Sequence, residues 1–215
     1  MWGSMAIVEP EQKRAVAFFD GQNLFRHAKA AFGHIHPNYD HKKLFGALCA
    51  NNGWNVQAVR FYTGIPGPKG DPMWQGYWNN RLLQMRRSGI MVTHRELRYH
   101  EIEVPQLDGT TKTEKIAHEK GIDVRLALDV VRLARQRQYD VAVIFSQDQD
   151  LAEVVSEVKE IAREQTRWLK IVSAYPFGPH ASAVRGIDGT DWLKMDQPFY
   201  DANLDSRDYR PKKKT

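Results

Sequence analysis

The stretch AVAFFDGQN, residues 15–23, decides the fold of this chain. Its first five residues are all apolar, which is typical of a strand buried on both faces of a parallel sheet. The polar residues DGQN then lead into Leu24, Phe25, Ala28 and Phe32, which recur at helical spacing. Because a buried strand that runs directly into a helix begins a β-α-β unit, we predict an α/β protein.

The alternation of strand and helix continues along the chain. Residues 63–70 are rich in glycine and proline and predict a loop, and alternation from residue 97 to 104 predicts a small hairpin or ribbon. Strands that alternate with helices favour a doubly wound parallel sheet. The remaining predicted elements are the strands 56–62, 90–93, 141–145 and 168–173 and the helices 44–50, 72–87, 122–137 and 151–161.

Length and composition favour one globular domain. The chain has 215 residues, of which 42% are hydrophobic and 27% charged. No apolar run approaches the ~20 residues of a membrane span, so no membrane partner is expected. There is no leader with a cleavage site, and Cys49, the single cysteine, cannot form an internal disulfide. We therefore expect a cytoplasmic protein.

The sequence predicts one domain between two short terminal segments, and most of the net positive charge lies at the C-terminal end. We expect a cloning scar and loose N-terminus over residues 1–13, a single domain over 14–200 and a basic, loose tail over 201–215. The net charge is +5, and residues 207–215 carry +4 of it, which leaves the rest nearly neutral. The basic excess therefore lies in a tail that either tethers a polyanionic partner or only adds solubility, and it is weak evidence for such a partner.

Acidic residues follow two of the predicted strands, at the strand ends where open α/β sheets bind their ligands. Asp20 follows the first strand, and Asp148 and Asp150 follow the strand 141–145. If these strands are neighbours, the carboxylates converge and repel each other, and Mg²⁺ or Mn²⁺ would offset that repulsion. The absence of a His/Cys ligand cluster argues against zinc.

Helix capping is the alternative explanation for these acids. Aspartate is among the commonest N-cap residues, and Asp150 with Glu153 has the spacing of a capping box. Three acids exceed what capping two helices requires, so both interpretations stay open.

The helix 122–137 carries two further acids with different surroundings. Asp129 lies between Arg125 and Arg132 on one polar stripe, which predicts a surface ion-pair ladder. Asp123 lies about 120° away on an apolar side. It is either a helix cap or a carboxylate that points toward the acids at the strand ends, with Lys120 beside it to meet a phosphate.

Three motifs in this order resemble the NYN domain family, in its LabA-like (DUF88) branch of the PIN-like nucleases. They are FDGQN at 19–23, KGIDV at 120–124 and SQDQDL at 146–151, and the resemblance extends over about residues 15–173. It implies a PIN-like three-layer α/β/α sandwich with a central parallel sheet in the strand order 3-2-1-4-5. It also implies a metal-dependent ribonuclease.

The resemblance assigns roles to individual residues. Two departures are Gln147, where the family has glycine, and Leu151, where it has phenylalanine; the bulkier Gln147 could restrict the loop or contact substrate. The implied metal ligands and catalytic residues are Asp20, Asp123, Asp148 and Asp150, with Asn23, Ser146 and Lys120 in support. One or two Mg²⁺ or Mn²⁺ ions would activate water for attack on a phosphodiester, leaving 3′-hydroxyl and 5′-phosphate ends.

Three functions are weighed on these grounds. The first is an Mg²⁺- or Mn²⁺-dependent ribonuclease acting on single-stranded or structured RNA. The second is a catalytically weak or inactive RNA-binding or assembly module on the same fold. The third, a phosphatase-like hydrolase, ranks last because it needs a second acid where Gln22 stands.

Basic and aromatic side chains are candidates for contacts with such a substrate. The aromatic residues of helix 72–87 would stack on bases, or else form part of the core or of a homodimer face. The candidates are Lys69, Arg81, Arg86, Arg87, Lys112, Lys115, Trp74, Tyr77 and Trp78.

Overall fold

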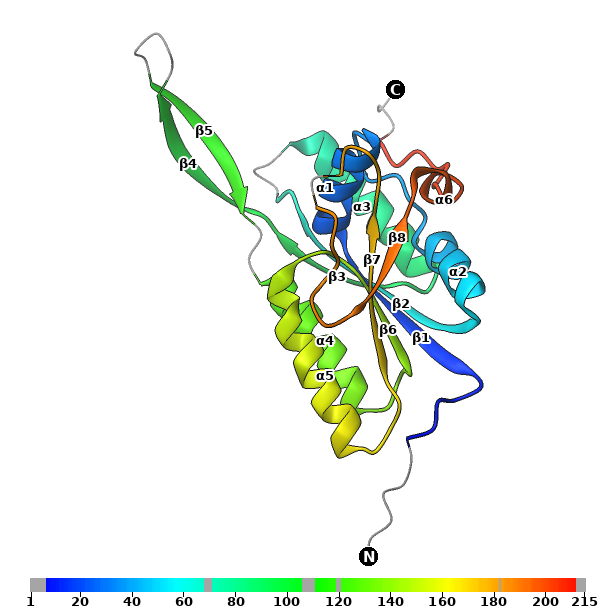
Figure 1. The fold of residues 1–215 in the computed structure, drawn as a ribbon. Coiled ribbons are helices and arrows are strands. Elements are labelled where there is room, and N and C mark those ends of the chain that lie inside the picture. Colours follow the sequence, from blue (N-terminus) through cyan, green and yellow to red (C-terminus); the bar gives the residue numbers. More distant parts are fainter. Residues whose placement is uncertain (1–6, 68–70, 106–110, 119–120, 182, 212–215) are drawn as a thin grey trace, which may run out of the picture.

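A central sheet of six parallel strands organises the protein (Figure 1). The computed structural model describes residues 7–67, 71–105, 111–118, 121–181 and 183–211, with side chains described except at 101–102 and 114–118. The strand order is β3-β2-β1-β6-β7-β8. The strands are β1 (Lys13–Asp20), β2 (Trp54–Ile65), β3 (Met91–Glu96), β6 (Val141–Phe145), β7 (Lys170–Pro176) and β8 (Asp191–Met195).

Helices cover both faces of this sheet, as the alternating side chains of its strands require. In β1, Ala15, Ala17 and Phe19 face one core while Val16 and Phe18 face the other. The first core is covered by α1, α2 and α3 and the second by α4 and α5, which gives the expected three-layer α/β/α sandwich. The helices are α1 (Gly21–Phe32), α2 (His41–Asn52), α3 (Pro72–Arg87), α4 (Ile122–Arg135), α5 (Ala152–Glu164) and α6 (Gln197–Asp201), with the 3₁₀ turn η1 (Gln149–Leu151).

The predicted architecture is confirmed with two differences. The five expected strands lie in the expected order, and β8 adds a sixth strand at the edge beside β7. The predicted loop at 63–70 is wrong in its first three residues, because Thr63, Gly64 and Ile65 continue β2 and pair with β3.

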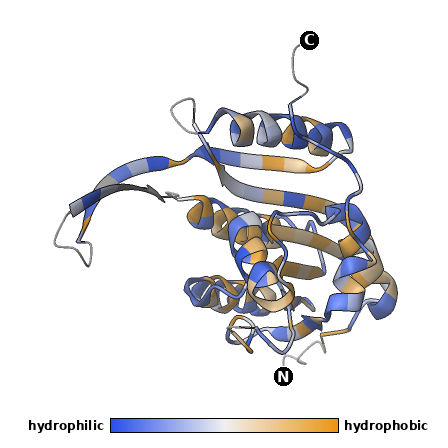
Figure 2. Cartoon of the chain, turned by 90° about the horizontal axis from the view of Figure 1, so that it is seen from above, coloured by the Kyte–Doolittle hydropathy of each residue, from blue (hydrophilic) through white to orange (hydrophobic). Residues whose placement is uncertain are grey.

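A two-stranded antiparallel ribbon projects from the body between β3 and α4. It consists of β4 (Arg98–Pro105) and β5 (Thr111–His118), and it confirms the predicted hairpin. Figure 2 shows the ribbon as largely hydrophilic, while the hydrophobic residues gather on the central strands and the helix faces toward them.

Residues 201–211, expected to be a loose tail, instead contact the domain. Asn203 accepts a hydrogen bond from the Asp40 backbone at 2.9 Å through its carbonyl. Tyr209 is buried, and its carbonyl accepts from the Asn80 side chain at 3.0 Å. The buried tyrosine and its neighbours therefore hold this segment against α3.

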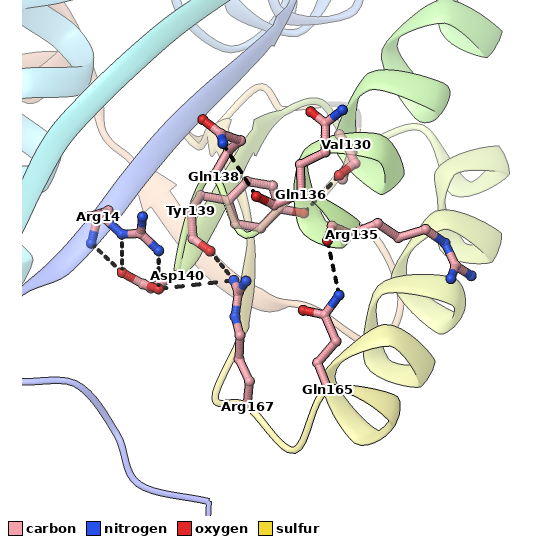
Figure 3. Close-up of polar contacts among 9 residues, drawn as sticks. All are labelled: Arg14, Val130, Arg135, Gln136, Gln138, Tyr139, Asp140, Gln165 and Arg167. Carbon is pink, nitrogen blue, oxygen red and sulfur yellow. Dashed lines mark hydrogen bonds and ion pairs between the residues drawn. The ribbon is translucent and has the colours of Figure 1, made fainter.

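An ion pair connects β1 to the start of β6, at the opposite end of these strands from Asp20 and Ser146 (Figure 3). Arg14 donates to both carboxylate oxygens of Asp140 at 3.0 Å, and Arg167 lies 4.0 Å from the same carboxylate. Burial raises the pKa of Asp140, but the hydrogen bonds from Arg14 outweigh it and leave that pKa below its ordinary value. Asp140 is therefore a structural anchor.

Candidate functional site

The carboxyl ends of β1 and β6 bring Asp20 and Ser146 side by side. These strands are parallel neighbours and Phe19 pairs with Phe145, so the next residue of each strand emerges at the same level. The Ser146 hydroxyl donates to Oδ2 of Asp20 at 3.2 Å and accepts from the backbone N–H of Asp148 at 3.2 Å. One serine thus connects the two acids that the sequence predicts at these strand ends.

Both acids also cap helices, so the capping interpretation is correct for each of them. Oδ1 of Asp20 accepts from the backbone N–H of Asn23 at 3.0 Å and caps α1. Oδ1 of Asp148 accepts from the backbone N–H of Asp150 at 3.1 Å and caps η1. The proposed capping box is wrong, because α5 begins after Leu151, whose side chain cannot accept a hydrogen bond.

Asp20 is the acid with the most perturbed environment. Burial raises its pKa to about 6, against the opposing effect of hydrogen bonds from Asn23 and Ser146. The charge of Asp148 raises the pKa further, and that of Arg26 lowers it. Asp20 and Asp148 therefore lie close enough to repel each other.

Asn23 supports this arrangement from within the protein. Its side chain is buried, and its Oδ1 accepts from the backbone N–H of Gln147 at 3.0 Å. The amide therefore fixes the start of α1 against the loop after β6 and holds the two carboxylates in register.

Asp150 and Asp123 are more exposed than the central pair. Asp150 lies in η1, and Asp123 lies in the first turn of α4, where Gly121 takes the N-cap position. Lys120 lies outside the described residues. Within the described part of the chain, no three His, Cys, Asp or Glu side chains form a group that could hold a metal ion as they stand.

Asp129 is confirmed as a structural acid, but the prediction that it lies on the surface is wrong. Its carboxylate is 2% exposed and lies 3.0 Å from Arg125 and 2.8 Å from Arg132. It also contacts Arg60 at 3.3 Å and accepts from the Tyr62 hydroxyl at 2.8 Å. The carboxylate therefore ties α4 to β2.

Several predicted substrate contacts have other roles. Arg81 is almost fully buried and donates to the Tyr77 hydroxyl at 2.7 Å and the Tyr39 carbonyl at 2.9 Å, so its assignment to substrate is wrong. Tyr77 is buried as well, whereas Trp74 and Trp78 keep part of their rings exposed. Arg86 and Arg87 are exposed, and Lys69 and the Lys115 side chain lie outside the described residues.

Gln147 clamps a neighbouring loop. Its side-chain amide donates to the carbonyls of Ala183 and Arg185 at 3.2 and 2.7 Å. Gln149 donates to the Gly186 carbonyl at 2.9 Å and accepts from the Asp188 backbone at 3.1 Å. The two glutamines hold the segment 183–188, between β7 and β8, against the loop that carries Asp148. Gln147 was expected to restrict its own loop or to contact substrate, and this link to a second loop was not anticipated.

Two residues of α1 near the acids escaped the sequence reasoning. Arg26 acts electrostatically on Asp20, and the charge of Asp148 acts on His27. Burial and the charge of Arg26 lower the pKa of His27, and Asp148 partly offsets this. Arg26 and His27 follow Asn23 by three and four residues, so the three side chains lie on one side of α1. This spacing is the signal by which the sequence could have placed Arg26 and His27 near the acids.

Comparisons with known proteins agree with this architecture. A crystal structure of VPA0982 from Vibrio parahaemolyticus RIMD 2210633, a protein of unknown function, shares 16% identity at a TM-score of 0.52. The match covers 89% of this chain and 98% of that chain, and it supports the fold alone. Acinetobacter baumannii MurG matches at 11% identity and a TM-score of 0.33, over 85% of this chain and 45% of that one, and carries no argument.

None of the helices in the described residues is long and apolar enough to cross a membrane.

A match to a protein family identifies the family of this chain. No curated protein matches the chain. The family profile of the NYN domain matches residues 14–175, a range that holds β1, β6 and the acids at their ends, and the chain therefore belongs to the NYN domain family, within the PIN-like nuclease superfamily.

Proposed function

We propose that the protein is an Mg²⁺- or Mn²⁺-dependent ribonuclease of the LabA-like (DUF88) branch, with its acidic site at the ends of β1 and β6. The observation that carries the proposal is the pair Asp20 and Asp148, joined through Ser146. Burial and mutual repulsion raise the pKa of Asp20 to about 6, so a divalent cation would relieve an existing electrostatic cost.

The donor set suits a hard cation. Carboxylates are the ligands that Mg²⁺ prefers, and Mg²⁺ is often held by only one or two of them, together with waters and substrate phosphates. Asp20 and Asp148 would provide this minimal set, with Asp123 and Asp150 as further carboxylates once substrate is bound. When bound, the cation would lower the pKa of a water molecule and so supply a nucleophile.

The protein's own residues would position the reacting groups. Asp20 and Asp148 orient the nucleophilic water toward the phosphodiester, and Ser146 and Asn23 fix the two carboxylates. Arg26, which acts electrostatically on Asp20, would balance the charge of a phosphate there, a role that the sequence motif also suggests for Lys120. Attack in line with the departing 3′ oxygen leaves 3′-hydroxyl and 5′-phosphate ends.

A catalytically weak RNA-binding or assembly module is the alternative, and one observation favours it. The described residues contain no three-ligand group as they stand. A homodimer stays a prediction. Action in the cytoplasm also stays a prediction, and it is argued from Cys49, which is free and buried.

Cleavage of labelled single-stranded RNA tests the proposal in EDTA, Mg²⁺ and Mn²⁺. We expect EDTA to abolish cleavage, and Asp20→Asn and Asp148→Asn each to lower the rate at least ~100-fold. Asp196→Asn is the matched control, because the Asp196 side chain caps α6 as Asp20 caps α1, by accepting from the backbone N–H three residues further on. Cleavage in EDTA, or full activity in both site variants, contradicts the proposal.

RNA binding that persists while the wild-type protein leaves the RNA intact with every metal favours the alternative. A mock purification from cells that lack the protein, carried out by the same procedure, serves as the blank in each assay, so that cleavage by a contaminating nuclease is recognised and subtracted.

A further inference from the structure

An aromatic groove begins directly beside the acidic site. It has a volume of about 420 Å³, and Gly21, the residue after Asp20, is one of the residues that line it. Phe25 and Arg26 of α1 line one side, and Trp74 and Trp78 of α3 line another. Ligand pockets commonly have volumes of about 300–1,000 Å³, so the groove is large enough for a nucleotide.

The two tryptophan rings in this groove pack against buried side chains of the protein. The ring centroids of Trp78 and Phe61 lie 6.2 Å apart with the rings nearly parallel. The guanidinium carbon of the buried Arg81 lies 5.7 Å from the Trp78 ring centroid. Trp74 meets Tyr77 edge to face at 5.3 Å. Because Trp74, Trp78 and Phe25 are each partly exposed, the groove offers rigid aromatic surface to a ligand.

The charge of the groove favours an anionic ligand. Among the described residues that line it, Arg26 is charged and none carries a carboxylate. Arg26 also lies close enough to Asp20 to lower its pKa. A phosphate at Asp20 and Asp148 would therefore have the arginine on its groove side, and the attached nucleoside would extend over Gly21 toward the rings.

We propose that this groove binds an unpaired base of single-stranded RNA and so selects single strands over duplexes, an inference that rests on the proposed function. Aromatic side chains stack on unpaired bases irrespective of sequence. A base inside a duplex has both faces covered by its neighbours, so it cannot enter the groove. The phosphodiester next to the stacked base then lies at the acidic site.

Binding in EDTA, which prevents metal-dependent cleavage, tests the groove directly. The probes are a labelled RNA of about a dozen nucleotides, the same strand with one abasic nucleotide, and its blunt duplex, measured by fluorescence anisotropy. We expect Trp74→Ala to weaken single-strand binding about tenfold or more and Trp74→Phe to retain most of it. Leu83→Ala, an exposed residue on the same helix outside the groove, should bind like the wild type.

A second pair of variants separates the groove from general electrostatics and from misfolding. Arg26→Glu should weaken binding several-fold more than Lys29→Glu, because both residues are exposed on α1 but only Arg26 lines the groove. Circular dichroism and thermal melting verify that each variant is folded.

The outcomes distinguish this inference from the proposed function. If Asp20→Asn loses cleavage while Trp74→Ala binds like Leu83→Ala, or if the duplex binds as tightly as the single strand, the groove proposal is wrong and the nuclease proposal stands. If Asp20→Asn and Asp148→Asn both keep full activity, the nuclease proposal is wrong whatever the binding results are. Concentration-dependent self-association that Trp74→Ala abolishes, with unchanged RNA binding, assigns the groove to a second copy instead.

Discussion

Asp20→Asn should make the metal-free protein more stable at neutral pH, although it removes a carboxylate from the centre of the acidic site. Burial raises the pKa of Asp20 from 3.8 to about 6. The folded protein therefore holds this proton more tightly than the unfolded chain does, so the free energy of unfolding falls as the pH rises from about 4 through 6. A difference of roughly two pKa units corresponds to about 3 kcal/mol.

The gain should depend on pH in a defined way. Above pH 7 the wild-type carboxyl is ionised and the variant gains the full ~3 kcal/mol, whereas at pH 4.5 the gain is about 1 kcal/mol. The substitution keeps one hydrogen bond and reverses the other: the carbonyl oxygen of the introduced amide would still accept from the backbone N–H of Asn23, and its NH₂ group would donate to the Ser146 hydroxyl oxygen, which now donates to Asp20. The charge is what changes.

Urea unfolding followed by circular dichroism, in EDTA at pH 4.5 and 7.5, measures these differences. Asp196→Asn is again the control, since Asp196 is exposed and also caps a helix, by accepting from the Phe199 backbone N–H at 2.9 Å. Replacing EDTA with Mg²⁺ at 100 times its Kd should add about 2.7 kcal/mol to the wild type and little to Asp20→Asn. A variant that is no more stable at pH 7.5, or a gain of equal size at both pH values, would refute a strained charge at Asp20.

Two further predictions concern residues that position the site. Asp129→Ala should cost about 3–5 kcal/mol of unfolding free energy, because Arg60 loses its buried carboxylate partner, whereas the exposed Asp123→Ala should cost less than ~1 kcal/mol; equal urea midpoints would contradict this. Gln147→Gly should raise amide hydrogen exchange in residues 183–188, since the clamp on that loop is lost; exchange unchanged from wild type would show that the loop is held by other contacts.

The fold was predictable wherever a segment carried its own pattern. Continuous apolar runs at 15–19 and 141–145 identified strands buried on both faces, and their positions agree with β1 and β6. The strand β8 has mostly exposed or half-buried side chains, with Met195 its buried residue, so it lacks such a run. An edge strand depends on its neighbour for pairing more than on its own sequence.

The docked C-terminal segment could not be predicted for a related reason. Tyr209 stands alone among polar residues, and its partners Tyr77 and Asn80 lie on a distant helix. Arg81 is misleading in the same way, because an arginine in a helix is ordinarily exposed, and only the tertiary structure encloses it in aromatic rings.

The acidic site was predictable in part. The rule that ligands bind beyond the carboxyl ends of strands identified Asp20 and Asp148, and helical periodicity separated Asp129 from Asp123. Periodicity describes one helix, however, and Asp129 is buried because β2 supplies Arg60 and Tyr62 across the interface. The position of Asp123 relative to the other acids depends on how α4 packs against the sheet, which the pattern of a single helix does not determine.

The electrostatic cost at Asp20 separates capping from ligand binding. Capping alone does not require a carboxylate there, since asparagine is as good an N-cap and carries no charge to bury. Asp20 nevertheless keeps an acidic group that burial and Asp148 both disfavour, and Ser146 and Asn23 hold it in position. Capping therefore explains one oxygen of this side chain, and a bound cation would explain why its charge is retained.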